Sequence, residues 1–197
     1  AEVIKVNGKN AAVQVFESTR GLKNGNDVEF EDKMLEATLG PGLLSSSYDG
    51  LQNDLTTMTG VFLKRGEYTD PLNHEKLWDF TPIAKPGDKV VAADWLGEVK
   101  EGWLPHKIMV PFSFKGEYTV KTVAPAGQYN IDKVIAVLTN AEGEDVEVTM
   151  WQKWPVKVAI KGYKDKPRPS RIMETGVRAI DTLNPIAEGG TGFIPGP

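Results

Sequence analysis

An imperfect internal repeat constrains the fold of this chain more than any other feature of its sequence. One copy, KPGDKVVAADWLGEV, runs from Lys85 to Val99, and the other, APAGQYNIDKVIAVL, runs from Ala124 to Leu138. Each copy places a glycine turn, at Gly87 or Gly127, before a strand of alternating polarity, and the second copy is one residue shorter when the glycines are aligned. Two such halves predict a small sheet folded on itself with approximate two-fold symmetry.

The tryptophans fall in the same window as the repeat. Large aromatic side chains concentrate where a compact core forms, so we expect residues 69–160 to be a separate domain with its own hydrophobic centre. The tryptophans of this window are Trp78, Trp95, Trp103, Trp151 and Trp154.

The first residues predict a β-hairpin. Alternating apolar residues from Val3 to Val6 precede the pair Asn7-Gly8, and a second alternating run covers 11–16. Asn-Gly adopts the positive φ values that a two-residue hairpin turn requires. A further strand over 28–30 would extend the hairpin to a small β-meander, too short to bury both of its faces alone. We therefore interpret residues 1–33 as part of a larger β-barrel.

Residues 34–68 predict a connector. The stretch 34–42 is extended and ends in a Gly-Pro-Gly turn. The spacing of apolar residues after it predicts a short helix, capped by Asp49 and ended by Gly60, with its apolar stripe in the core. That stripe is Leu51, Leu55 and Met58.

The region from 161 to 197 begins with a run of basic residues interrupted by prolines, and a segment with regularly spaced apolar residues follows it. We interpret the run as a solvated linker rather than a phosphate or nucleic-acid patch, because no aromatic residues interleave for base stacking. Spacings of three from Val177 to Leu183 predict a short helix closed by Asn184-Pro185. A buried strand is expected over 191–194, and Gly196 follows it, as a phosphate-cradling loop begins.

Composition excludes several classes of protein. With 23 Lys+Arg against 27 Asp+Glu, the chain carries a formal charge of −4, which removes the broad electrostatic case for nucleic acid. The absence of cysteine excludes a disulfide scaffold, a thiol nucleophile and Cys-ligated zinc. His74 and His106 have no partners at metal-ligand spacing, so we expect structural roles and no metal site. No apolar run is long enough for a membrane helix.

The repeat resembles the biotinyl/lipoyl carrier modules, the barrel-sandwich hybrids. In those carriers a modified lysine sits at the tip of an attachment hairpin, which matches Leu96 to Pro111 here. That position is Trp103 in this sequence, and Lys100 and Lys107 are out of register with it. An indole cannot be acylated, so the resemblance implies the carrier fold without its chemistry.

A second resemblance covers nearly the whole chain. The stretches ATLGPGLLSSSYDGLQ, TGVFLKRG, TPIAKPGDKV, HKIMVP, WPVK and TGVRAIDTLNPIAEGGTGFIPGP occur here in order. This set resembles the catalytic A subunit of the V/A-type rotary ATPases, which is distinguished by a bulge insertion. The start at Ala1 and the apolar end at FIPGP are further reasons to expect a piece of a longer protein.

The rotary-ATPase resemblance implies a parent enzyme that couples ATP hydrolysis or synthesis to ion transport, with ATP and Mg²⁺ as its cofactors. Gly196 matches the first glycine of the phosphate loop, and every catalytic residue would lie downstream of Pro197. The chain alone is therefore expected neither to bind nor to hydrolyse ATP. Implied partners are B subunits in an alternating A₃B₃ hexamer, the central stalk and the peripheral stalk, with Trp103 and Leu104 as a candidate interaction surface. Membrane insertion is not expected, and the implied location is cytoplasmic, peripheral to the membrane.

The predicted fold is mainly β: a remnant of an N-terminal β-barrel over 1–33, a connector over 34–68, a barrel-sandwich bulge over 69–160, and a linker with the start of an α/β nucleotide-binding domain over 161–197. Two interpretations of Trp103 remain open, an exposed anchor or a plug that closes the end of the small barrel. A carrier-like protein and a purely structural interaction module also remain alternatives.

Overall fold

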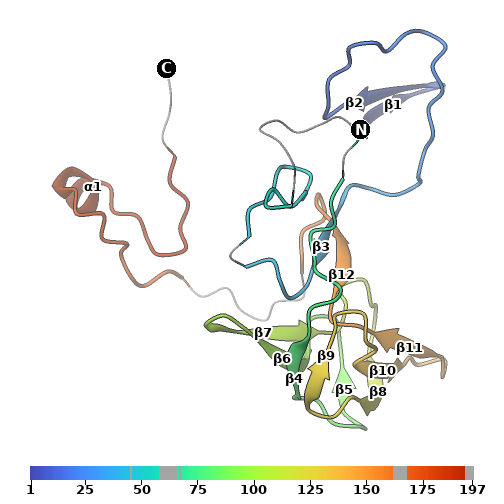
Figure 1. Ribbon diagram of the computed structural model, residues 1–197, viewed down its shortest axis with the longest axis vertical. Coiled ribbons are helices and arrows are strands. Elements are labelled where there is room, and N and C mark those ends of the chain that lie inside the picture. The colour runs from blue at the N-terminus through green and yellow to red at the C-terminus, as the bar shows by residue number, and fades with distance from the viewer. Residues whose placement is uncertain (45, 58–65, 67, 162–167, 194–197) are drawn as a thin grey trace. The chain divides into compact units, whose positions relative to one another are not determined.

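The computed structural model describes residues 1–44, 46–57, 66, 68–161 and 168–193 (Figure 1). The chain divides into two compact units, Ala1–Gly162 and Tyr163–Pro197. The first unit contains every described strand, and the only described helix, α1 (Arg178–Leu183), is in the second. The prediction of a mainly β chain is confirmed.

The centre of the first unit consists of two four-stranded sheets around one core. In one sheet the strand order is β7-β6-β4-β9, and in the other it is β11-β10-β8-β5. The first sheet contains β4 (Trp78–Pro82), β6 (Trp95–Glu101), β7 (Leu104–Met109) and β9 (Gly127–Tyr129). The second contains β5 (Lys89–Val90), β8 (Tyr118–Val123), β10 (Ala136–Thr139) and β11 (Asp145–Val148).

The two sheets are equivalent, and the internal repeat explains why. Strands β4 to β7 of the first half correspond in order to β8 to β11 of the second, and each half places its second strand at the edge of the other half's sheet. The glycines aligned in sequence occupy equivalent positions: Gly127 pairs with the buried Phe80, and the Gly87 N–H donates to the carbonyl of the buried Val120 at 2.8 Å. The predicted two-fold arrangement is confirmed. The exchange of one strand between the two halves is a further feature of the structure.

The core is aliphatic more than aromatic. Its buried hydrophobic residues all lie between Leu72 and Met150, and Phe80, Leu96 and Ile135 are almost completely inaccessible. The expected hydrophobic centre within residues 69–160 is present, but Trp78 is the one tryptophan among its buried residues. Trp78 is 4% exposed, but Trp95 is 53% exposed and Trp103 is 87% exposed. Aliphatic residues of the alternating strands fill the narrow space between the two sheets.

The N-terminal hairpin forms as predicted, from β1 (Glu2–Asn7) and β2 (Asn10–Gln14). Its turn is displaced by one residue: Asn7 pairs with Asn10, so the loop is Gly8-Lys9, with φ of 59° at Gly8. A glycine with positive φ at the first loop position is the requirement of a type II′ turn. The expected strand over 28–30 does not form, and Val28 and Phe30 are exposed there.

The connector pairs with the chain that leaves the sandwich. Strand β3 (Glu36–Leu39) lies antiparallel to β12 (Gln152–Pro155) and ends in the predicted turn of residues 40–42. The helix expected from Asp49 is absent over the described residues 49–57, and Met58 and Gly60 lie outside them. Gln52 has a φ of 65°, which no helix accommodates, and Tyr48 bridges Asp54 instead.

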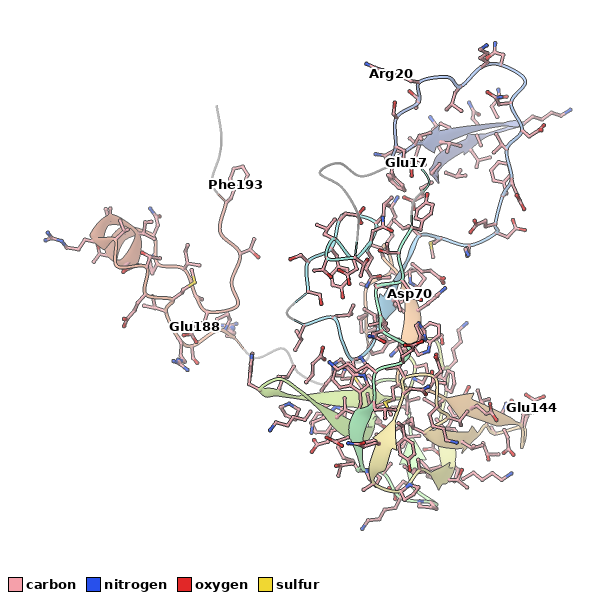
Figure 2. All side chains as sticks on the ribbon, in the orientation of Figure 1. Glu17, Arg20, Asp70, Glu144, Glu188 and Phe193 are labelled. Carbon is pink, nitrogen blue, oxygen red and sulfur yellow. The ribbon has the colours of Figure 1, made fainter. Side chains whose placement is uncertain are left out.

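In the second unit, α1 ends at Leu183 and Asn184 is its C-cap, as the Asn184-Pro185 pair predicts. Residues 191–193 form no strand, and Phe193 is 87% exposed (Figure 2). The buried strand expected there is therefore wrong for those residues. Gly196 and Ile194, together with Lys164, Asp165 and Lys166 of the basic run, lie outside the described part of the chain.

Candidate interaction site at the hairpin tip

Trp103 lies at the tip of the hairpin between β6 and β7. Glu101 pairs with Leu104, so Gly102 and Trp103 form the two-residue loop. The Trp103 side chain is 87% exposed, and Leu104 beside it is half-buried. Trp103 is therefore exposed and does not close the end of the sandwich, and its role as an anchor stays a prediction.

The hairpin that carries the tip is braced along its length. Lys107 forms an ion pair with Glu98, its cross-strand partner, and its ammonium group lies 4.9 Å from the centre of the Trp95 ring. A cation over an indole face is attracted by the ring's quadrupole, so both contacts hold the same side chain. These two contacts restrain the Lys107 side chain on this side of the hairpin.

A buried carboxylate ties the base of the hairpin to the connector. The Glu101 side chain is only 6% exposed, and its Oε1 accepts hydrogen bonds from the backbone N–H groups of Gly42, at 2.7 Å, and Leu44, at 3.1 Å. Its Oε2 lies 2.7 Å from Nδ1 of His106. We call this set, Glu101, His106, Gly42 and Leu44, the Glu101 clamp. It joins the chain segment next to Trp103 to the Gly-Pro-Gly turn.

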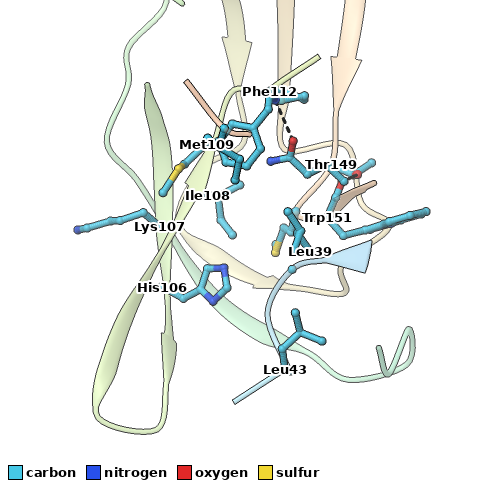
Figure 3. Close-up of a pocket in the computed structure, with 14 residues that line it drawn as sticks. Leu39, Leu43, His106, Lys107, Ile108, Met109, Phe112, Thr149 and Trp151 are labelled. Atoms are coloured by element: carbon cyan, nitrogen blue, oxygen red, sulfur yellow. Dashed lines mark hydrogen bonds between the residues drawn. The ribbon is translucent and has the colours of Figure 1, made fainter. Parts of the chain in front are cut away.

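A cavity of about 280 Å³ lies beside the clamp, between β7 and the paired strands β3 and β12 (Figure 3). Its wall is largely apolar, and the imidazole of His106 forms part of it. The Phe112 N–H donates to Oε1 of Gln152 at 2.8 Å across the upper part of the cavity. The main apolar side chains of the wall are Leu39, Leu43, Ile108, Met109 and Trp151.

The second histidine also has a structural role, but its partners are not apparent from sequence spacing. His74 lies between two carboxylates, with Nδ1 2.7 Å from Asp132 and Nε2 3.0 Å from Asp70. Trp151 donates its Nε1–H to Asp132 at 2.8 Å and packs edge-on against the His74 ring. Only a doubly protonated imidazole donates from both nitrogens, so the geometry is that of a charged His74.

The His74 network makes stability depend on pH. The hydrogen bond with Asp132, followed by the charge of Asp70, raises the pKa of His74 above its ordinary 6.5 despite partial burial. A raised pKa stabilises the folded state fully below the ordinary value, and this contribution is lost as pH rises through the folded value. We expect a loss of under about 1 kcal/mol, because partly exposed ion pairs are weak in water.

Urea unfolding at mildly acidic and mildly alkaline pH measures this effect. The native chain should lose stability on going to alkaline pH, and His74→Gln should lose markedly less. An unchanged pH slope in His74→Gln would show that the stabilising charge lies elsewhere. On the acidic side, the dependence of stability on pH comes from Asp132. The hydrogen bond to His74 lowers the pKa of Asp132, so the contribution of this carboxylate to stability is lost only as pH falls through that lowered value.

The tip does not carry the chemistry of a swinging-arm carrier. Lys100 precedes the tip and pairs with Pro105 within the paired strands, and Lys107 follows the tip and contacts Glu98.

Within the described ranges, no cluster of three or more His, Asp or Glu side chains is arranged to hold a metal ion. In the same ranges no helix has the length and apolar character needed to cross a bilayer.

Comparison with known families agrees with this architecture. Residues 69–157 match the ATP synthase alpha/beta subunit barrel-sandwich domain, and residues 1–32 match the β-barrel domain of the ATP synthase alpha/beta family. The sandwich with exchanged strands and the N-terminal hairpin lie in the parts of the chain that these two domains match. The chain belongs to the ATP synthase alpha/beta family.

Within this family the chain is similar to V-type ATP synthase alpha chains along its whole length. It is 49% identical over 200 aligned positions to the V-type ATP synthase alpha chain of Borrelia turicatae, covering 100% of this chain and 35% of the relative. For the same protein of Treponema denticola the identity is 46%, and 34% of the relative is covered. The chain thus spans about a third of the length of the curated relatives it matches.

Proposed function

We propose that this chain is the β-rich part of a V-type ATP synthase alpha chain, an enzyme subunit that couples ATP hydrolysis or synthesis to ion transport. The observation that supports the proposal most directly is the 49% identity to such a chain over the full 197 residues. In this assignment, 1–33 belongs to the crown β-barrel and 34–68 is the connector. Residues 69–160 are the bulge, and 161–197 lead into the nucleotide-binding domain.

We expect these residues alone to provide no nucleotide site. ATP and Mg²⁺ would be cofactors of the whole subunit, but the sequence holds no complete G-x-x-x-x-G-K-[ST] loop, and Gly196 lies outside the described residues. Phosphoryl transfer requires positioned charge around the phosphates, which in the whole subunit would come from the residues of a complete phosphate loop. We therefore assign to these residues a scaffold and docking role. Isothermal titration of MgATP into the 197-residue chain should give no binding heat, and micromolar affinity would refute this assignment.

The docking surface in this proposal is the hairpin tip, Trp103 with Leu104. An exposed aromatic on an ordered support loses little conformational entropy on binding, and such residues dominate interface energies. The partners in the assembled enzyme are B subunits of an alternating hexamer, the central stalk and the peripheral stalk, in the cytoplasm and peripheral to the membrane. The tip is assigned to the peripheral stalk.

The test is Trp103→Ala in the complete alpha chain, assembled with its partner subunits. We expect the isolated peripheral stalk to bind the assembled complex roughly 30-fold more weakly, the cost of losing a hot-spot aromatic. ATP hydrolysis by the complex without the stalk should be unchanged. Trp95→Ala is the matched control, because Trp95 is also exposed but lies along the hairpin beside Lys107. Equal stalk binding by the two variants would exclude the tip as the docking surface.

A further inference from the structure

The sequence contains two Asn-Gly pairs, and the structure holds them differently. Asn7-Gly8 spans the end of β1 and its turn, and Asn24-Gly25 lies in the irregular loop between β2 and β3 that also carries Arg20 (Figure 2). We propose that Asn24 is a site of spontaneous deamidation, an intramolecular modification that converts the amide to aspartate and isoaspartate. The proposal does not depend on the function assigned above.

The reaction needs only the chain and water. The backbone nitrogen of Gly25 attacks Cγ of Asn24, the Cγ–Nδ2 bond breaks, and the nitrogen leaves as ammonia with the proton lost from the Gly25 amide. Water then opens the five-membered succinimide. Breaking the bond between Cγ and the ring nitrogen gives aspartate, and breaking the main-chain carbonyl bond to that nitrogen gives isoaspartate. Glycine favours the first step, because it has no Cβ to obstruct ring closure.

The surroundings of Asn24 leave this reaction unobstructed. Asn24 and Gly25 are both exposed, and a Cβ built on Gly25 would meet no atom within 4 Å. Two hydrogen bonds between Lys23 and Asn26 close the turn around them, from the Asn26 N–H to the Lys23 carbonyl at 3.2 Å and from the Lys23 N–H to Oδ1 of Asn26 at 2.7 Å. Among the described residues no hydrogen bond engages the side-chain amide of Asn24 itself. The Asn24 side chain can therefore rotate to present Cγ.

Asn7 is held where Asn24 is not. It is the last residue of β1 and pairs with Asn10 across the hairpin turn, so its backbone is part of the ladder. Ring closure at Asn7 requires rotation of the main chain between Asn7 and Gly8, which breaks that pairing. Breaking this cross-strand pairing slows the reaction at Asn7 by about tenfold, which corresponds to about 1.4 kcal/mol.

Deamidation at Asn24 changes the loop in two ways. A new carboxylate next to Lys23 takes the formal charge of the chain from −4 to −4 − 1 = −5. Isoaspartate also adds a carbon atom to the main chain inside the turn, which lengthens the path between the carbonyl of Lys23 and the N–H of Asn26. The exposed loop thus carries an age-dependent chemical change that the sandwich does not share.

The experiment ages the folded 197-residue chain at mildly alkaline pH and follows both Asn-Gly peptides by mass spectrometry, with isoaspartyl methyltransferase labelling to detect isoaspartate. We expect Asn24 to convert about ten times faster than Asn7, and the two rates to converge in urea, where the ladder is lost. Asn24→Gln should abolish the fast phase, and Asn7→Gln should leave it unchanged. Equal rates in the folded chain, faster conversion of Asn7, or the same ratio in urea would each overturn the proposal.

Discussion

Replacing Gly97 by alanine should unfold the sandwich or leave it barely stable. Gly97 lies in β6, opposite Pro82 of β4, and a Cβ built on it would come within 2.3 Å of Cε2 and 2.4 Å of Cζ of Phe80. The Phe80 ring is 1% exposed in the core and cannot move outward, and the carbonyl of Thr81 is 2.9 Å away on the other side. Overpacking of this kind costs about 3 kcal/mol, and the rigid backbone neighbour adds to it.

Urea unfolding followed by tryptophan fluorescence measures this cost, because Trp78 is buried in the same core. Gly50→Ala is the matched control: its Cβ would meet nothing within 4 Å, so its midpoint should scarcely move. A second variant, Phe80→Leu with Gly97→Ala, should recover part of the loss if the clash is with the ring. Native-like stability of Gly97→Ala alone would contradict the packing described here.

Truncating Glu101 should be nearly as damaging, for an electrostatic reason. Glu101→Ala removes the acceptor of the Gly42 and Leu44 N–H groups and leaves His106 without its carboxylate partner, all in a site where Glu101 is 6% exposed. Leaving buried hydrogen-bond donors without their carboxylate acceptor costs about 3 kcal/mol. The clamp would open, and the Gly-Pro-Gly turn would lose its attachment to the hairpin.

Hydrogen exchange makes this prediction specific. In Glu101→Ala the amides of Gly42 and Leu44 should lose protection, together with a large fall in the free energy of unfolding. Glu101→Gln is the informative control, because its amide oxygen can still accept from both N–H groups; it should keep most of their protection and lose less stability. Retained protection at Gly42 and Leu44 in Glu101→Ala would mean that the clamp does not hold the turn.

Local patterns predicted those parts of the fold whose geometry is set by neighbours in sequence. The Asn-Gly pair gave the N-terminal hairpin to within one residue, and the spacing from Val177 gave α1 and its end at Asn184. The repeat gave the equivalence of Val99 and Leu138, which pair with Phe80 and Val120 in matching sheets. Periodicity does not show which sheet a short strand joins, so the exchange of β5 and β9 was not predicted.

The helix predicted from Asp49 is absent over residues 49–57, and tertiary hydrogen bonds that local patterns omit explain why. Asn53 is 5% exposed, its Nδ2–H donates to Asp49, and its Oδ1 accepts the N–H of Thr69 at 3.0 Å. The Thr69 hydroxyl in turn accepts the N–H of Asp54 at 2.6 Å. These two contacts span 15 and 16 residues, and the Thr69 hydroxyl satisfies the Asp54 N–H, which a helix would have satisfied internally. Tertiary hydrogen bonding therefore outweighed the helical spacing of the leucines.

The candidate site, like the fold, has some features that the sequence predicts and others that only the structure shows. The sequence by itself determined the repeat, which follows from residue order, and its resemblance to known families predicted the family and the position of Trp103 at a hairpin tip. Only the tertiary structure decided that Trp103 is exposed, that Glu101 is buried against the turn at 40–44, and that His74 lies between Asp70 and Asp132. Those facts depend on residues up to 59 positions apart in the sequence meeting in the folded chain, which no local pattern encodes.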